Sequence, residues 1–322
     1  MVAAGASIDL VQRLLGRSAT VERPITVDQT NYSVVVDESF IVKWLQPPVS
    51  VPHPGVETIR HLAAAGFDEM PSLLAAAEHD GNVHAIISAY LPGAVDGWEW
   101  YVDDVDKWLA VDDAVDVLGP ARRMGAITSR LHSALADLDA AIVDVRPVVE
   151  QAIADMHLAK ARLDGLEWLD EGRVRDALQP LLDTGRVDGH RIHGDLHAGQ
   201  FLRSGPVMLV TDFDGNPLGD QTRRRLAQSP LRDVASLVQS LEHVAAIVVK
   251  RRRPHQRIAA ERFAREATAA ALQAYTADHP IDNDLLHGFR VAQELHEYAY
   301  SIHHLPHWRY VADAALPALL GM

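Results

Sequence analysis

The chain contains no cysteine, and its 30 basic side chains are outnumbered by 44 acidic ones, which gives a formal charge of −14. Without cysteine, the chain cannot form disulfides, thiolate-bound zinc sites, iron–sulfur clusters or a thiol nucleophile. The acidic excess argues against wrapping nucleic acid or lying on anionic lipid, because both partners require a positive field. It is typical of a soluble protein, and it would also help to attract a cationic ligand.

Long apolar segments are missing as well. No run of about 18 apolar residues occurs, and residues 1–20 lack a basic start followed by a long apolar stretch. We therefore expect neither a transmembrane helix nor a secretory signal, and we expect a cytoplasmic protein. With 48% hydrophobic residues, the 322-residue chain can bury a sizeable core. Its length favours two lobes over one.

The first ninety residues are predicted to be mainly strands. Two β-branched runs, 33–36 and 40–44, flank a polar turn and predict a hairpin. Residues 55–65 have the composition of a helix, and Gly66 is placed to end it. Residues 82–90 predict another strand. The Leu-Pro-Gly sequence that follows at 91–93 indicates a lobe boundary.

After this boundary the pattern becomes helical, with one interruption. Helices are predicted over 98–109, 115–136, 148–163, 174–182, 230–250, 257–275 and 285–302. Strands are predicted over 190–193, 200–203 and 207–213. The basic run at 250–253 ends a predicted helix, where cations complement the helix dipole. The acidity of the remaining chain argues against nucleic-acid binding by this run.

The strand-rich interruption carries a dense set of polar side chains at strand ends, where a core does not need them. These side chains are His193, Asp195, His197, Gln200, Asp212 and Asp214. Gln200 and Asp212 can supply two oxygen ligands to one hard cation and leave positions open. Such a set suits Mg²⁺ held jointly with the phosphates of a nucleotide.

Two other interpretations of this segment compete with nucleotide binding. His193 and His197 are four residues apart, as in a zinc-binding helix, but the segment lacks the Glu of H-E-x-x-H and contains a glycine. A purely structural turn rich in Asp and Gly is the second alternative. The Asp-Phe-Asp sequence at 212–214, at a suitable distance, favours the nucleotide interpretation over both.

The pattern His193-x-Asp195-x₄-Gln200, followed by Asp212-Phe213-Asp214, resembles the catalytic loop and metal motif of protein-kinase-like enzymes. The form HGDLHAGQ is similar to the aminoglycoside-phosphotransferase-like sugar kinases, above all to actinobacterial maltokinases and glucosamine kinases. Segments 229–234 and 305–308 match that group too, so the resemblance covers most of the chain. It implies a two-lobed α+β, protein-kinase-like fold with a small β-rich N-terminal lobe (1–91) and a large, mainly helical C-terminal lobe (92–322).

The resemblance implies a role for each polar side chain of the segment. Asp195 would bind the acceptor hydroxyl and accept its proton. Gln200 and Asp212 would hold Mg²⁺, and Asp214 would support a second metal or hold the loop. His193 would brace the catalytic loop, and His197 would approach the substrate or the phosphate.

A kinase of this type also needs a cation on the nucleotide phosphates. Lys43, one of very few lysines, lies in the apolar strand predicted over 40–44. A lone lysine in a strand commonly faces solvent at a sheet edge. The helix that follows, with Glu57, favours the functional role, in which Glu57 pairs with Lys43. Glu69 is the alternative partner.

Two further segments are expected to bind the nucleotide. The loop at 28–33 would cover the phosphates, with Asn31 or Ser33 donating to phosphate oxygens, although it contains no glycine. At the predicted hinge, backbone groups of Ala89 and Leu91 would bind adenine.

The acceptor is expected to contact the C-terminal helices. Maltokinases commonly have Y-E-x-x-Y-E before R-P-x-W, and here Glu297, Tyr300 and Trp308 match while Ser301 replaces the second Glu. This departure, and the shorter chain, favour glucosamine, whose ammonium group Glu297 would face. Asp233, in the first turn of a predicted helix, would tie that helix to the catalytic loop.

The sequence thus predicts an ATP- and Mg²⁺-dependent sugar kinase that acts on the 6-hydroxyl of glucosamine. Maltose, at its anomeric hydroxyl, and an aminoglycoside are the alternative acceptors, and a non-catalytic nucleotide-binding module is the alternative of another class. We expect a monomer or weak dimer, with a small sugar as its partner and neither nucleic acid nor membrane.

Overall fold

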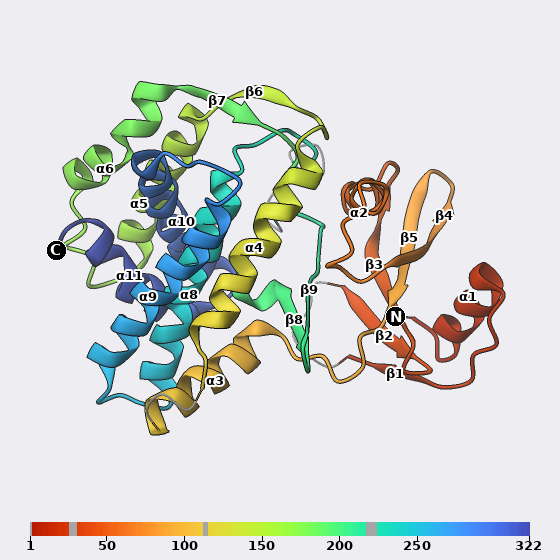
Figure 1. Ribbon diagram of the computed structural model, residues 1–322. Coiled ribbons are helices and arrows are strands. Elements are labelled where there is room, and N and C mark those ends of the chain that lie inside the picture. Colours follow the sequence, from red (N-terminus) through yellow and green to blue (C-terminus); the bar gives the residue numbers. More distant parts are fainter. Residues whose placement is uncertain (1, 26–30, 112–114, 217–223) are drawn as a thin grey trace. The chain divides into compact units, whose positions relative to one another are not determined.

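The computed structural model describes residues 2–25, 31–111, 115–216 and 224–322 (Figure 1). The chain folds into two compact units, each made of two stretches of sequence. We call Met1–Val95 with Leu202–Arg225 the sheet unit, and Asp96–Phe201 with Leu226–Met322 the helical unit. Residues 202–225 thus belong with the N-terminal stretch, whereas the sequence placed the whole chain after residue 91 in one lobe. A lobe boundary at residue 91 stays a prediction.

The sheet unit contains a five-stranded antiparallel sheet with strand order β1-β2-β3-β5-β4. Its strands are β1 (Glu22–Pro24), β2 (Tyr32–Val36), β3 (Phe40–Ser50), β4 (Leu73–His79) and β5 (Asn82–Ala89). The predicted hairpin is present as β2 and β3. Asp37 and Glu38 in its turn have φ values of 48° and 46°, in the left-handed region where Asp is tolerated.

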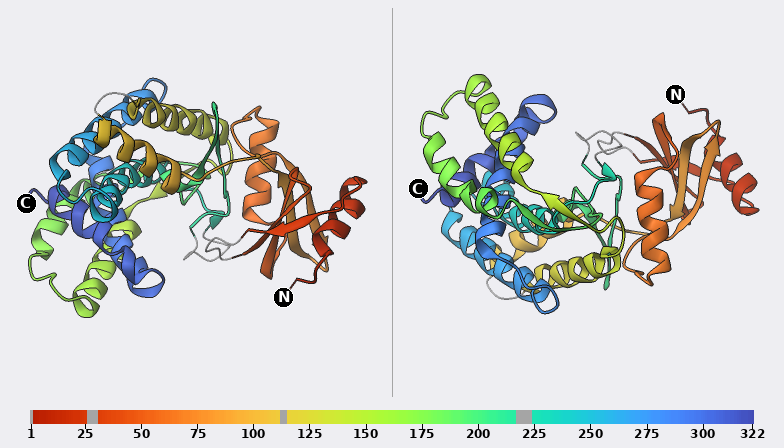
Figure 2. Two further views of the ribbon diagram at one scale, coloured as in Figure 1. Left: turned by 90° about the horizontal axis from the view of Figure 1, so that it is seen from below. Right: turned by 90° about the horizontal axis from the view of Figure 1, so that it is seen from above.

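One helix covers each face of this sheet (Figure 2). On one face, Leu10 and Val11 of α1 (Ala6–Leu15) pack with valines of β2 and β3. On the other, Val56 of α2 (Pro54–Ala64) packs with Leu45 and Ile86. Burying both faces removes apolar surface from water and stabilises the sheet.

The helix α1 was not predicted from the sequence. Its first turn is capped by the Glu22 carboxylate, which accepts hydrogen bonds from the backbone amides of Gly5 (2.5 Å) and Ile8 (3.2 Å). Glu22 is 17 and 14 residues away from these amides along the chain, so no local capping pattern in the sequence predicts the start of this helix.

The second stretch of the sheet unit is a short hairpin. Its strands are β8 (Phe201–Ser204), whose first residue lies in the helical unit, and β9 (Val207–Val210). The hairpin is attached to the N-terminal stretch by backbone hydrogen bonds between Arg203 and Val95 and from Val210 N–H to the Glu69 carbonyl. The strand predicted over 207–213 therefore ends three residues early. The strand predicted over 190–193 is not formed, because β7 ends at Gly189 and only His190 makes an isolated bridge.

The helical unit is built mainly from long helices whose apolar sides meet. They are α3 (Gly97–Val111), α4 (Leu118–Leu135), α5 (Arg146–Arg162), α6 (Glu171–Thr184), α8 (Leu231–Arg251), α9 (Arg257–Tyr275), α10 (Asn283–His303) and α11 (Tyr310–Leu319). A short ribbon joins β6 (Ala141–Asp144) to β7 (Arg186–Gly189), and single 3₁₀ turns lie at η1 (Ala198–Gln200) and η2 (Pro306–Trp308).

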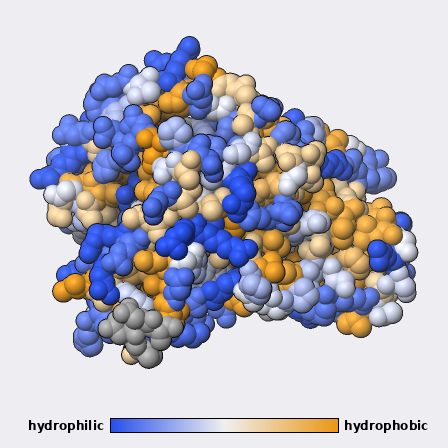
Figure 3. All heavy atoms as spheres, viewed as in Figure 1, coloured by the Kyte–Doolittle hydropathy of each residue, from blue (hydrophilic) through white to orange (hydrophobic). Residues whose placement is uncertain are grey.

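The core of this unit gathers side chains from α5, α6, α8, α10 and α11, such as Met156, Leu178, Val234, Leu295 and Leu316. Hydrophilic residues predominate over the face of this unit in Figure 3. Among the described residues, no helix combines the length and the apolar composition that a membrane span requires.

Candidate active site

The Asp-Phe-Asp segment in the sheet unit converges on Lys43. Asp212 follows β9 with a φ of 65°, and Phe213 beside it is buried. The Lys43 ammonium nitrogen lies 2.7 Å from Asp212 Oδ1 and 2.7 Å from Asp214 Oδ2. Burial alone would lower the pKa of Lys43, but the two carboxylates outweigh burial and raise the pKa, so the side chain stays charged.

Lys43 lies in the interior of the sheet, because β3 has a neighbour on each side. Its direct cross-strand partners are the buried Ser33 on β2 and Ile86 on β5. Residues directly opposite each other in an antiparallel pair share a face, so Ser33 and Lys43 project to the same side. The interpretation of Lys43 as an edge residue is therefore wrong.

The predicted ion pair between Lys43 and Glu57 is not formed. Glu57, in the first turn of α2, instead lies 3.1 Å from Arg225, and among the described residues Lys43 contacts the carboxylates of Asp212 and Asp214. Glu69, the alternative partner, does not contact Lys43 in this part of the chain either. The reason is geometric: the segment after β9 brings two carboxylates to Lys43 and a guanidinium to Glu57.

Two residues that the sequence did not single out border this ion cluster. A Cβ added to Gly55 would lie 2.5 Å from Asp214 Oδ1 and 3.2 Å from the Phe213 carbonyl, so the start of α2 needs a glycine there. His53 accepts a hydrogen bond from Val56 N–H at Nδ1 (3.3 Å) and caps α2. Burial lowers the pKa of His53, and the nearby Lys43 and Arg224 cations act in the same direction. Pro54-Gly55 at a helix start was the available sequence signal.

The other predicted nucleotide residues also lie in the sheet unit. Asn31 is half-buried just before β2, while residues 28–30 of the predicted phosphate loop lie outside the described residues. At the predicted hinge, Ala89 N–H donates to the Ser72 carbonyl and the Leu91 carbonyl accepts from Ala94 N–H. Adenine binding here would therefore use the Ala89 carbonyl and the Leu91 N–H.

In the helical unit, the catalytic loop is held by Asp233 of α8. The Asp233 carboxylate accepts hydrogen bonds from His193 N–H (2.7 Å) and Gly194 N–H (2.8 Å), and His132 Nε2 lies 3.2 Å away. Burial would raise the pKa of Asp233, but the bonds from His132 and the loop outweigh it and lower the pKa. His193 Nδ1 lies 3.3 Å from Asp195 N–H and so braces the loop at the next position.

Asp195, His197 and Gln200 are neighbours in this loop. His197 Nε2 lies 4.0 Å from Asp195 Oδ2 and 3.4 Å from Gln200 Nε2. The loop is fixed at its far end by Ala198 N–H, which donates to Ser240 Oγ on α8 at 2.8 Å. Within the described ranges, no group of three or more His, Asp or Glu side chains is arranged to bind a metal.

Two of the predicted acceptor residues, His197 and Trp308, contact Trp98 at the start of α3. The Trp98 ring stacks on His197 at 5.3 Å and meets Trp308 edge-on at 5.4 Å. Burial raises the pKa of Tyr300, and the nearby Asp195 charge raises it further. Glu297, one turn before Tyr300, accepts a hydrogen bond from Gln293 at 2.9 Å, and burial raises its pKa. The helical unit thus brings an acidic loop, two aromatic rings and a carboxyl group together.

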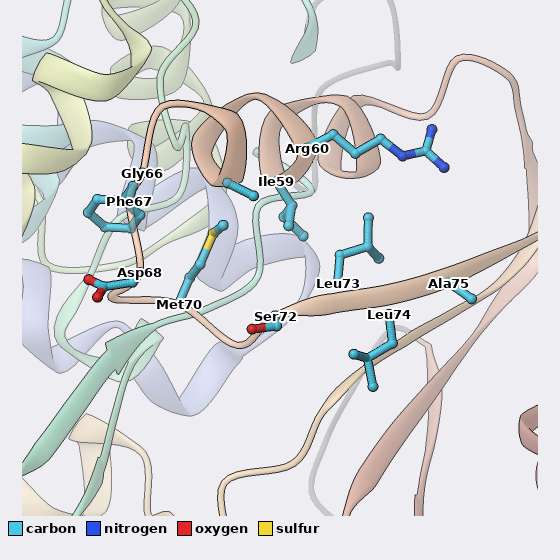
Figure 4. Close-up of a pocket in the computed structure, with 11 residues that line it drawn as sticks. Ile59, Arg60, Gly66, Phe67, Asp68, Met70, Ser72, Leu73, Leu74 and Ala75 are labelled. Atoms are coloured by element: carbon cyan, nitrogen blue, oxygen red, sulfur yellow. The ribbon is translucent and has the colours of Figure 1, made fainter. Parts of the chain in front are cut away.

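A cavity of about 480 Å³ lies elsewhere in the sheet unit, between α2 and the start of β4 (Figure 4). Its lining is mostly apolar, with Ile59, Phe67 and Leu73, together with the charged Arg60 and Asp68. None of the predicted site residues lines this cavity.

Comparison with known proteins decides the family. No family model matches the chain. A glucosamine kinase of Streptacidiphilus jiangxiensis is 39% identical over 94% of this chain and 74% of its own length. A glucosamine kinase of Mycolicibacterium smegmatis is 35% identical over 94% of this chain and 81% of its own length. The chain belongs to the glucosamine kinase family.

Solved structures agree with this family assignment. A glucosamine kinase in complex with glucosamine, ADP and inorganic phosphate aligns with a TM-score of 0.83 at 33% identity, over 99% of this chain and 84% of that one. A choline/ethanolamine kinase family protein of Mesorhizobium loti aligns with a TM-score of 0.57 at 15% identity over 99% and 92% of the two chains, which shows the fold alone. The predicted family and the aminoglycoside-phosphotransferase-like fold are confirmed.

The Asp233 contacts lead to a stability prediction. Asp233→Asn replaces one acceptor oxygen by a donor facing the loop amides, and it should lower the free energy of unfolding by about 3 kcal/mol at neutral pH. The pKa of Asp233 in the folded protein lies below its ordinary value of 3.8. The stabilisation that the ionised Asp233 gives the wild type is therefore fully present above pH 3.8, and it is lost as the pH falls through the pKa of the folded protein. The difference in the free energy of unfolding between wild type and Asp233→Asn should therefore become smaller in acid.

Urea unfolding of both proteins at neutral pH and at about pH 3 measures this gap. The control is Asp188→Asn, a change at an exposed side chain of β7, which should leave stability unchanged. An equal loss at both pH values would contradict the assigned role of the carboxylate.

Proposed function

We propose that this chain is an ATP-dependent kinase that phosphorylates the 6-hydroxyl of glucosamine. The observation that carries the proposal is the match to curated glucosamine kinases over 94% of the chain. The similarity to a glucosamine kinase that binds glucosamine and ADP, with a TM-score of 0.83, supports it further. The cytoplasmic location and the monomeric or weakly dimeric state stay predictions.

Asp195 is the proposed catalytic base. Its loop is held by hydrogen bonds at three backbone amides, those of His193, Gly194 and Ala198. A carboxylate on a fixed backbone can orient the acceptor hydroxyl and take its proton as the bond to phosphorus forms. His197, beside Asp195 and stacked on Trp98, is suited to bind the sugar or the phosphoryl group.

The residues present fit a magnesium ion. Asp212 and Asp214 each place one oxygen 2.7 Å from a single ammonium nitrogen, so these carboxylates already face one common cation. We propose that Asp212 and Gln200 hold Mg²⁺, with Asp214 in support, while Lys43 contacts the nucleotide phosphates. Bound Mg²⁺ would neutralise negative charge on the transferring phosphoryl group.

Glu297 is the proposed contact for the amino group of the acceptor. It lies one turn before Tyr300, and the charge of Asp195 acts on Tyr300 and raises its pKa. An ammonium group gains a charge-assisted hydrogen bond from a carboxylate that a neutral hydroxyl does not. This contact favours glucosamine over glucose or maltose.

The acceptor is tested by measuring ADP release with Mg·ATP and a panel of sugars. We expect turnover with glucosamine and at least tenfold lower kcat/KM with glucose and maltose, as expected for loss of one charge-assisted hydrogen bond. The panel includes aminoglycosides. A clear preference for maltose or an aminoglycoside would assign the alternative acceptor, and bound ATP without any turnover would favour a binding module.

The catalytic role of Asp195 is tested by Asp195→Asn. Asn cannot accept the proton, so kcat with glucosamine should fall about 10²–10⁴-fold. ATP affinity, measured by calorimetry, should stay unchanged, which shows that the variant is folded. Wild-type turnover in this variant would rule out Asp195 as the base.

The metal role of Asp212 is tested by Asp212→Asn. Loss of the carboxylate should weaken the Mg²⁺-dependent part of ATP binding at least tenfold, as seen in calorimetric titrations with and without Mg²⁺. The matched control is Asp80→Asn, another aspartate with positive φ (48°), which lies in an exposed turn of the same unit. Unchanged Mg²⁺ dependence in Asp212→Asn would contradict the metal role.

A further inference from the structure

A buried cluster of charged side chains joins α8 to α10 in the helical unit. Gln239 and Glu294 are fully buried, and His243 is 3% exposed. Glu294 Oε1 accepts a hydrogen bond from Gln239 Nε2 (2.6 Å) and lies 2.8 Å from His243 Nε2. Arg290 contacts both Gln239 and Glu242 and closes the cluster at its other end. None of these residues has a role in the proposed mechanism.

His243 is the cation at the centre of this cluster. Burial by itself would lower its pKa, but Glu294, Glu297 and Glu242 together raise the pKa to about 9. The imidazole therefore carries a positive charge at neutral pH. Its N–H can donate to Glu294, which needs a buried partner because an isolated carboxylate is costly away from water.

Around this cluster the carboxyl groups outnumber the cationic side chains by three to two. Glu294 pairs with His243 and Glu242 pairs with Arg290, while Glu297, one turn after Glu294 on α10, is the third carboxyl group and acts on His243 through its charge. Glu294 Oε2 is buried and has no hydrogen-bond partner in the described part of the chain. Burial also raises the pKa of Glu242 and Glu297, as expected for carboxyl groups that lack sufficient compensation.

The cluster reaches the proposed acceptor contact along one helix. Glu297 lies one turn after Glu294 and one turn before Tyr300, and each three-residue step rises about 4.5 Å along α10. The groups that act on Glu297 are His243 of α8 and Glu294, Gln293 and His296 of α10. On the neighbouring helix α5, Asp155 lies 3.4 Å from His296 and partly offsets that histidine.

We propose that Glu294 determines acceptor specificity by keeping this cluster one positive charge short, so that the ammonium group of an amino sugar completes it at Glu297. This inference rests on the proposed function, because it assumes that the acceptor contacts Glu297. Glu294 is a positioning residue that acts through Glu297. A neutral sugar brings no positive charge, so the cluster would not strengthen its binding.

The variant that tests the proposal is Glu294→Gln. Glutamine keeps an oxygen for Gln239 and His243 but removes the negative charge, so three carboxyl groups become two against two cations. We expect kcat/KM for glucosamine to fall about 10- to 100-fold, mainly through KM. The value for glucose should change less than twofold, so the preference for the amino sugar shrinks.

The matched control is Glu171→Gln. Glu171 also pairs with a histidine and an arginine, His157 (3.0 Å) and Arg175 (2.6 Å), but on the exposed surface of the same unit. This variant should keep the wild-type ratio of the two kcat/KM values. An unchanged ratio in Glu294→Gln, or an equal loss for both sugars, would overturn the proposal.

A measurement on the wild type decides the question if Glu294→Gln does not fold. At mildly acidic pH, arrival of an ammonium group should displace a proton from the cluster, because a nearby cation lowers the pKa of a carboxyl group. Calorimetry in two buffers of different ionisation enthalpy should detect proton release with glucosamine and none with glucose. Absence of release would overturn the inference, and a wild type that phosphorylates no amino sugar would overturn the proposed function with it.

Discussion

The buried carboxylate of Asp233 is the interaction on which the geometry of the catalytic loop depends. A loop that carries His193, Gly194 and Asp195 exposes backbone amides that need acceptors once they leave water. Asp233 supplies both acceptors at once, to His193 and Gly194, and His132 holds the carboxylate from α4. The position of Asp195 thus depends on Asp233, a residue of a packed helix about forty positions away, as well as on the local bond from its own amide to His193.

Charge is distributed very differently in the two units. In the sheet unit, the half-buried ammonium group of Lys43 lies 2.7 Å from each of two carboxylates, those of Asp212 and Asp214. In the helical unit, Glu294 pairs with His243 and Glu242 pairs with Arg290 between helices α8 and α10, one turn away from Glu297. Part of the acidic excess of the chain is thus grouped at two places. At each of them we expect a cation to bind: Mg²⁺ at Asp212 and the ammonium group of the sugar at Glu297.

Much of the fold was predictable because its elements carry strong local patterns. The β-branched runs of β2 and β3 enclose a polar turn, and α9 was predicted over its full observed span because its apolar side chains recur at helical spacing. The segments 193–200 and 212–214, which carry the proposed catalytic and metal residues, were also visible, since their polar residues are close together in sequence. The stripe of apolar residues along α8 likewise marked its buried side.

What the sequence did not reveal depends on partners far apart in the chain. Glu22 caps α1 from outside the helix, and Glu57 pairs with Arg225 instead of Lys43. The network of Glu294, His243 and Gln239 likewise links residues about fifty positions apart, on two helices. Each side chain had several plausible partners by charge, and only tertiary packing selects among them.

The path of the chain through the two units has a consequence for dividing the protein. The backbone passes from one unit to the other after Val95, after Phe201 and after Arg225. A cut after Val95 would therefore give a first fragment without Asp212 and Asp214, the ion-pair partners of Lys43. Two contiguous pieces therefore cannot each contain one whole unit, and after a cut at Val95 the sheet unit would have to be assembled from both pieces.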